Sequence, residues 1–177
     1  TISAYENLIS AAERRMYRNN ESTTVIRISD LIGVIPAITG KVELVYEGEQ
    51  EGTSFVANHL ISEATKTLFL HYFPKIEKLK KQDQETPYDE VLQWFFEADA
   101  FELSDEANEA NYTKALLNIK PLVKLLKKYQ PKVAAIDTPF LMEFILWALV
   151  EFKQLSKHRT AGGTAFNDSF NNYIKGL

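Results

Sequence analysis

Apolar residues recur every three or four positions along most of the chain, the spacing that places side chains on one face of a helix. The first such stripe consists of Tyr5, Leu8, Ile9, Ala12 and Met16. Ser3 and Glu6 match a capping box at the start of that helix, and a polar run at 18–21 marks its end. The pattern therefore predicts an amphipathic helix at the start of the chain.

Similar stripes and helix-start signals predict helices through the middle of the chain. A hydroxyl or acidic cap, or a proline in the first turn, marks several of these starts. Helices are expected from Ser29 to near Pro36, over 53–73, and onward from Thr86, Ser104 and Pro121. The short stretches 23–28 and 42–46 are predicted to be extended connections, because β-branched residues or a two-residue alternation dominate them.

The most apolar segment lies in the last third of the chain. It opens at Thr138, is apolar nearly all round, and is predicted to be a buried central helix that reaches His158. After Gly162 and Gly163, a final stripe predicts a terminal helix, and it consists of Phe166, Phe170, Tyr173, Ile174 and Leu177. Because the predicted elements are almost all helical, we expect an all-α fold.

Composition narrows the function classes. The 177 residues, 45% hydrophobic and 25% charged, are typical of a globular protein with a real core. A net charge of −4 argues against a nucleic-acid partner. The chain has no cysteine, which excludes disulfides and zinc-thiolate sites and is compatible with the cytoplasm, where we expect the protein to reside. The apolar stretch 140–150 is too short to span a membrane and contains Glu143.

The stretch ITGKVELVYEGEQEG at 38–52 carries parts of two known motifs. A phosphate-binding loop ending in Gly40-Lys41 would need a glycine at Ile35 and a hydroxyl at Val42. A calcium loop starting at Glu47 would need its closing glutamate at Asn58. Neither motif is therefore present.

Other candidate chemistry is sparse. His59 and Glu63 share a helix face but offer only two metal ligands, and His71 points elsewhere. Lysines cluster at helical spacing with aliphatic residues, which indicates the solvated faces of amphipathic helices; they are Lys75, Lys78, Lys80, Lys81, Lys120, Lys124, Lys127 and Lys128. The aromatic residues 94–96 and Trp147 are most simply core. The residues alone predict no catalytic, cofactor or metal site.

A resemblance adds to this. The segment RISDLIGVIPAITGKVELVYEGEQEG (27–52), then TPYDEVLQWF (86–95), KPLVKLLKKY (120–129) and LVEFKQLSKHR (149–159), resembles the C-terminal part of magnesium-chelatase-like bacterial AAA+ ATPases. The resemblance covers most of the chain and is most specific at 36–52.

This resemblance implies a division into two parts. Residues 1–45 would belong to the AAA+ lid, and 46–177 would be a family-specific helical domain. The ATP- and magnesium-binding motifs would precede Thr1, so the chain would be a non-catalytic fragment of an ATPase. Its partners would be that ATPase core and neighbouring subunits of a homo-oligomeric ring. The alternative is a stand-alone helical module that binds a peptide or small ligand.

The loop at 40–52 is our candidate functional segment. We expect it to be a hinge and contact loop in which glycines supply unusual backbone angles and acidic residues face basic groups of the ATPase core or a neighbouring subunit. Its residues are Gly40, Lys41, Glu43, Glu47, Gly48, Glu49, Glu51 and Gly52. A merely solvated acidic turn is the alternative.

Overall fold

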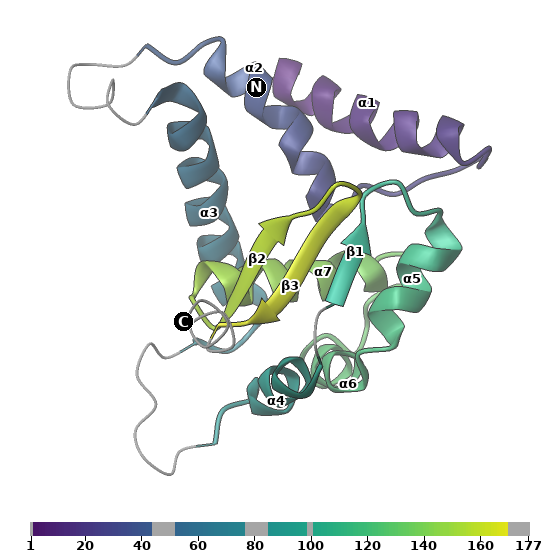
Figure 1. Cartoon of the computed structure of the whole chain (residues 1–177), viewed down its shortest axis with the longest axis vertical. Helices are drawn as coiled ribbons and strands as arrows, with labels where there is room; N and C mark the ends of the chain where they lie inside the picture. The colour runs from purple at the N-terminus through teal and green to yellow at the C-terminus, as the bar shows by residue number, and fades with distance from the viewer. Residues whose placement is uncertain (1, 44–51, 77–84, 99–100, 170–177) are drawn as a thin grey trace.

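Helices surround one small antiparallel sheet in this protein (Figure 1). The computed structural model describes residues 2–43, 52–76, 85–98 and 101–169. The described elements are α1 (Ile2–Arg18), the 3-10 helix η1 (Ile28–Val34), α2 (Ile35–Thr39), α3 (Gly52–Tyr72), α4 (Asp89–Glu97), β1 (Phe101–Ser104), α5 (Glu109–Leu117), α6 (Lys120–Tyr129), α7 (Thr138–Glu151), β2 (Leu155–Arg159) and β3 (Gly163–Asp168). The fold is mixed α/β, and the all-α prediction was wrong.

The sheet has the strand order β1-β3-β2, with both pairs antiparallel. The central strand is therefore β3, the last strand in the described part, and it pairs with a strand from much earlier in the chain through Phe101↔Phe166. Leu103 of β1 is buried while Glu102 and Ser104 are exposed, the alternation of a strand with one covered face. This four-residue strand is too short to leave a recognisable pattern in the sequence.

Helix α7 forms the centre of the core, as predicted. Met142, Ile145, Leu146, Ala148 and Leu149 are fully buried, and the neighbouring helices and the sheet close around them. An apolar circumference is what a helix needs when it is covered on every side. The predicted buried central helix is thus confirmed up to Glu151.

The predicted continuation of this helix to His158 was wrong. The N–H of Lys153 donates to the Val150 carbonyl, and the N–H of Gln154 donates to the Leu149 carbonyl. With Lys153 at φ 61, these bonds form a Schellman motif, the common left-handed helix ending. Because that position usually holds glycine and here holds lysine, the sequence showed no stop signal.

The predicted terminal helix was also wrong where it is described. Phe166 lies in β3 and is fully buried, and residues 170–177 lie outside the described part. Gly163 starts the strand, where an added Cβ would lie 2.1 Å from the Leu103 carbonyl oxygen. The close approach of β1 therefore requires glycine at that position.

The N-terminal helices pack on one another and on the central part of the chain. Helix α1 lies along η1 and α2, α2 reaches α3, and η1 reaches α7 (Figure 1). Helix α1 ends at Arg18, as predicted, with Asn20 in the left-handed region. The predicted boundary at 45/46 falls in a stretch outside the described residues.

Candidate functional site

A group of ionisable side chains is buried where the N-terminal helices meet α5 and α7. We call it the buried polar network, and it consists of Arg15, Arg27, Asp30, Glu109, Tyr112 and Glu143. All but Glu109 are less than 9% exposed, although side chains of these types normally remain in contact with water. Charged groups at such depth need partners, and the network supplies one to each charge, although the Nε atoms of Arg15 and Arg27 have no hydrogen-bond partner among the described residues.

Glu143 supplies the hydrogen bonds that begin η1. Its Oε2 accepts the N–H of Ile28 at 2.9 Å, and its Oε1 accepts the N–H of Ser29 at 3.1 Å. The hydroxyl of Tyr112 donates to Oε2 at 2.8 Å. The first N–H groups of a helix have no partner within it, so a carboxylate from α7 caps η1 from across the core.

Arg27 fastens the same junction from the other side. Its guanidinium lies over the Tyr112 ring at 3.9 Å from the centroid, a cation–π contact that is strengthened by burial. It also donates to the Ala107 carbonyl at 2.8 Å and to a Glu109 carboxylate oxygen at 3.3 Å. Arg27 therefore joins η1 to the start of α5.

Arg15 joins α1 to η1. Its guanidinium forms a buried ion pair with Asp30 and donates to the Val25 carbonyl at 2.7 Å. The second carboxylate oxygen of Asp30 accepts the backbone N–H of Arg27 at 2.8 Å, which begins η1 in the manner of a capping box. The network thus runs from α1 through η1 to α5 and α7.

Burial controls the ionisation of these groups. Loss of water raises the pKa of Glu143 to about 7, although Tyr112, the two backbone N–H groups and Arg27 all favour its charged form. Burial and the Arg15 charge lower the pKa of Arg27, and Glu109 opposes this shift. Burial raises the pKa of Tyr112. The network can hold α1, η1, α5 and α7 together and bind one proton near neutral pH.

Sequence reasoning had missed this network. In the sequence, Glu143 stands out only as a charge within an apolar stretch, and this isolation signals a functional or structural role. Arg27 and Asp30 both lie in the segment RISD. The side-chain partners of Arg27, Ala107 and Glu109, are about 80 residues away, and the partner of Asp30, Arg15, lies on another helix. Only the fold brings these residues together.

The structure describes residues 40–43 and Gly52 of the predicted hinge and contact loop. Gly40 is the C-cap of α2, and its N–H donates to the Pro36 carbonyl at 3.2 Å. It therefore ends a helix, whereas the glycine of a phosphate loop precedes one. Lys41 donates through Nζ to the Ser3 hydroxyl of α1 at 2.9 Å, and Glu43 is exposed.

The glycines of this loop differ in conformation. Gly52 begins α3 at φ +77, in the left-handed region that favours glycine, whereas Gly40 has an ordinary φ of −72. The prediction of an unusual backbone angle is confirmed at Gly52 and wrong at Gly40. Four of the candidate loop residues lie outside the described part, namely Glu47, Gly48, Glu49 and Glu51.

The histidine and lysine predictions can also be placed. His59 is exposed and stacks on Phe55, and no group of three His, Asp or Glu side chains in the described part could hold a metal ion. The lysines of α6 are exposed while its leucines are buried, which confirms a solvated amphipathic face. One lysine of α6, Lys124, forms an ion pair with Glu90 of α4, with its Nζ atom 2.6 Å from a carboxylate oxygen.

The aromatic predictions are confirmed in part. Phe95 is buried, Phe96 is 56% exposed, and Trp94 is half-buried at the edges of Phe95 and Phe101. Trp147 is half-buried, and the Lys157 ammonium lies 3.6 Å from its ring centroid.

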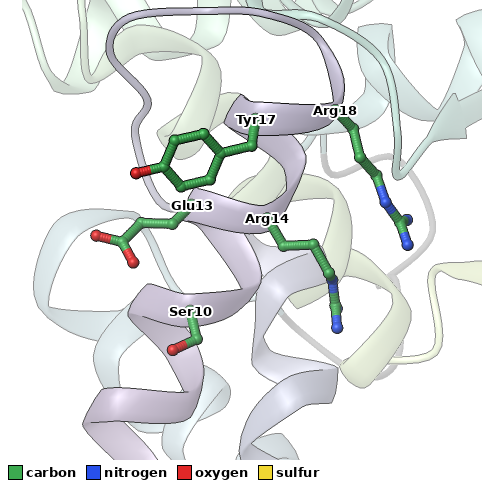
Figure 2. Close-up of a pocket in the computed structure, with 5 residues that line it drawn as sticks. All are labelled: Ser10, Glu13, Arg14, Tyr17 and Arg18. Carbon is green, nitrogen blue, oxygen red and sulfur yellow. The ribbon is translucent and has the colours of Figure 1, made fainter.

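Helix α1 presents a shallow hollow of about 460 Å³ on its outer side. Figure 2 shows Arg14 and Arg18 extending to the same side of the helix, with Glu13 and Tyr17 on the other. Arg18 also contacts Glu106 at 2.6 Å, at the start of the α5 region. This surface is open and mixed in charge, so it has the character of a contact surface rather than an enclosed ligand site.

Comparisons with protein-family models, with curated proteins and with solved structures find no significant match to this chain. Within the described ranges, no helix is long and apolar enough to cross a membrane.

Proposed function

We propose that this chain is the C-terminal, non-catalytic region of a magnesium-chelatase-like AAA+ ATPase of the cytoplasm. In this proposal the parent protein binds ATP and magnesium through a core that precedes Thr1. The chain links movement of that core to the assembly of a homo-oligomeric ring or to a partner protein. The proposal rests on the resemblance at 27–52, 86–95, 120–129 and 149–159.

The observation that supports a linking role is the contact of Glu143 with the first N–H groups of η1. Through it, the segment that resembles an ATPase lid is held to the buried central helix α7. The ion pair of Arg15 with Asp30 extends this connection to α1. Because the interior is closely packed, a displacement of α1 would be transmitted through η1 to α7.

The loop at 40–52 has a contact role in this proposal. Its first residues are tied to α1 through Lys41 and Ser3, so its path starts from the lid-like segment. Acidic side chains that face a basic surface increase the rate and specificity of association more than its strength. The acidic residues of the loop would therefore orient the ATPase core or a neighbouring subunit.

A stand-alone binding module remains the second candidate, and one hollow favours it. A space of about 590 Å³ lies between α3 and the end of α7, lined by Glu63, Lys66, Glu151, Phe152, Lys153 and Gln154. Its volume is within the usual range for small ligands, but such pockets are mostly apolar. The charged lining therefore supports a stand-alone binding module less well than the resemblance supports an ATPase region.

The loop provides the test. In the full-length parent, Glu47, Glu49 and Glu51 are changed together to Gln, and the native mass and the ATPase rate are measured at low and high salt. The proposal expects weaker assembly or slower turnover, with a smaller salt dependence than in the unchanged protein. The control is the exposed, paired Glu90→Gln, which should leave both measurements unchanged.

Two results would count against the proposal. A parent gene without a phosphate-binding loop upstream of Thr1 would exclude the ATPase assignment. A triple variant that assembles and turns over ATP normally would leave the loop as a solvated acidic turn.

A further inference from the structure

The Tyr112 hydroxyl lies between two acceptors but has only one hydrogen to donate. The Glu143 Oε2 atom is 2.8 Å away, and the Pro139 carbonyl oxygen is 3.4 Å away in the first turn of α7. The shorter distance is that of a good O–H···O hydrogen bond. The longer one lies beyond the usual range, so the Tyr112 oxygen must move by about 0.4 Å or more toward Pro139 to make a good bond there. The hydroxyl therefore has two possible partners on the same helix.

Glu143 is buried, so a change in its charge must be accommodated by rearrangement of the hydrogen bonds around it and not by water. Oε2 accepts both Ile28 and Tyr112, and Oε1 accepts Ser29, so the carboxylate already has three donors. The side chain is 1% exposed. Protonation would place a fourth hydrogen on the group, and that hydrogen needs an acceptor.

The charged and titratable groups around Glu143 come from two directions. Arg27, at the start of η1, and Tyr112, on α5, act on it directly. Arg15 and Glu109 act on the Arg27 guanidinium, and Asp30 accepts the backbone N–H of Arg27. The other helices packed on α7 contribute apolar side chains to this core, including Phe69 of α3 and Leu122 and Leu126 of α6.

We propose that Glu143, Tyr112 and the Pro139 carbonyl form a proton-dependent clamp that holds η1 against α7. On protonation, a solvent proton binds Oε2 and the new O–H donates to the Tyr112 oxygen. The Tyr112 hydrogen then turns to the Pro139 carbonyl, while the N–H groups of Ile28 and Ser29 keep their acceptors. The neutral clamp makes four hydrogen bonds and buries no charge on the carboxyl group.

The clamp is tightest when Glu143 is protonated. Burial raises the pKa of Glu143 to about 7, above its ordinary value of 4.5, so the closed state binds a proton that an opened state would release. The clamp therefore holds η1 against α7 less strongly as the pH rises toward the pKa of Glu143 in the folded state. This inference depends on the geometry of the core and stands whether or not the chain belongs to an ATPase.

The test uses NMR on the 177-residue chain. The carboxyl carbon of Glu143, the carbonyl carbon of Pro139 and the amide protons of Ile28 and Ser29 are followed from acidic to alkaline pH. The clamp expects one common midpoint near 7 for all four signals. It also expects hydrogen-exchange protection of the Ile28 and Ser29 amides, corrected for intrinsic exchange, to fall about tenfold between about pH 5.5 and 6.5.

Two variants separate the clamp from a general effect of charge. In Tyr112→Phe, the Pro139 signal should stop responding while Glu143 still titrates, at a higher midpoint because one donor to its charged form is lost. In Glu143→Gln, the protection of η1 should not depend on pH.

The unchanged protein alone can overturn the proposal, so a variant that fails to fold does not remove the test. A Glu143 midpoint below about 5, close to that of an ordinary carboxyl group, would overturn the proposal. A Pro139 carbonyl that stays constant while Glu143 titrates would overturn it as well. A Pro139 response that persists in Tyr112→Phe would show that the hydroxyl does not turn.

Discussion

At the scale of single residues, the N-terminal segment is held by ionisable groups buried inside the protein. Arg15 and Arg27 are 3% and 1% exposed, and Glu143 is 1% exposed. Buried ionic groups contribute little to net stability when compared with apolar replacements, but removing one partner leaves the other unpaired at high cost. The buried polar network therefore specifies which segment begins η1 and where it packs.

The first prediction concerns the pH dependence of stability. The folded pKa of Glu143 is raised to about 7 from 4.5, so the folded protein binds more protons than the unfolded chain within that window. This contribution is fully present below the unfolded pKa and is lost as the pH rises through the folded pKa. The free energy of unfolding, measured by urea denaturation, should therefore fall across this window in the wild type relative to Glu143→Gln.

At each pH, the free energy of unfolding of Glu143→Gln is subtracted from that of the wild type. The difference cancels the contribution of the other titrating groups and leaves that of Glu143. A difference between the two proteins that is constant from pH 4.5 to 7 would contradict the raised pKa of Glu143.

The second prediction compares a buried ion pair with an exposed one. Asp30→Ala removes the partner of Arg15 and the acceptor of the Arg27 N–H, and it should destabilise the protein by about 3–5 kcal/mol. Glu106→Ala removes the exposed partner of Arg18 and should cost no more than about 1 kcal/mol. Chemical denaturation of both variants gives the comparison. Equal losses would show that Arg15 finds another partner or reaches water.

The sequence could predict only part of this residue-level arrangement. The absence of a phosphate loop was readable, because fixed spacing is a local property of the chain. The network was not readable, because its members come from segments far apart in the chain and meet only through the fold. A lone glutamate in an apolar helix signals that a partner exists, but it does not say which residue provides it.

At the scale of elements, helix interiors followed the sequence better than helix ends. Helix α3 lies where a stretch with few helix breakers predicts it, α6 begins beside Pro121, and α7 follows the segment that is apolar nearly all round. Two ends are made by Asn20 and Lys153 in left-handed conformations instead of by glycine. The chain reversal after Glu151, and so the existence of β2, therefore had no local marker.

The third prediction tests the close approach of β1 and β3. Gly163→Ala places a methyl group 2.1 Å from the Leu103 carbonyl oxygen and 2.8 Å from the Ser104 Cα, both backbone atoms that cannot rotate away. The strands must separate, and we expect a loss of about 2–4 kcal/mol, measured by thermal or urea unfolding.

Its neighbour provides the matched control. An added Cβ at Gly162 would meet only a Glu102 side-chain oxygen, at 3.9 Å, so Gly162→Ala should change stability by less than about 1 kcal/mol. Similar losses in the two variants would mean that chain flexibility, and not the strand contact, explains the requirement for glycine.

At the scale of the whole molecule, the described part joins the N-terminal helices to a core built on α7 and a small sheet (Figure 1). The fold class was mispredicted because β1 and β2 contribute four and five residues. The alternation in β1 spans only those four residues, and residues 155–158 and Phe166, which lie in β2 and β3, were assigned to helices. The helical part of the architecture was predictable, and the sheet was not.

The fourth prediction concerns nucleotides. The isolated chain should neither bind nor hydrolyse ATP, because Ile35 and Val42 occupy the positions where a phosphate loop needs glycine and a hydroxyl, and Gly40 ends a helix. Isothermal titration calorimetry with magnesium-ATP should give no heat of binding. Micromolar binding would contradict the assignment of nucleotide chemistry to a preceding core.

The position of β3 at the centre of the sheet also governs the order in which the protein can fold. Its partners β1 and β2 both precede it, so neither has a neighbouring strand until residues 163–168 have been synthesised. The pairing of Phe101 with Phe166 closes a long loop, a step that is entropically slow compared with helix formation. Until then, the part of the core that Phe166 completes beside Phe101 and α4 stays open to solvent. A ribosome-bound chain that stops before Gly163 should consequently be helical, incompletely packed and prone to association, and completion of the last strand should convert it to the native state.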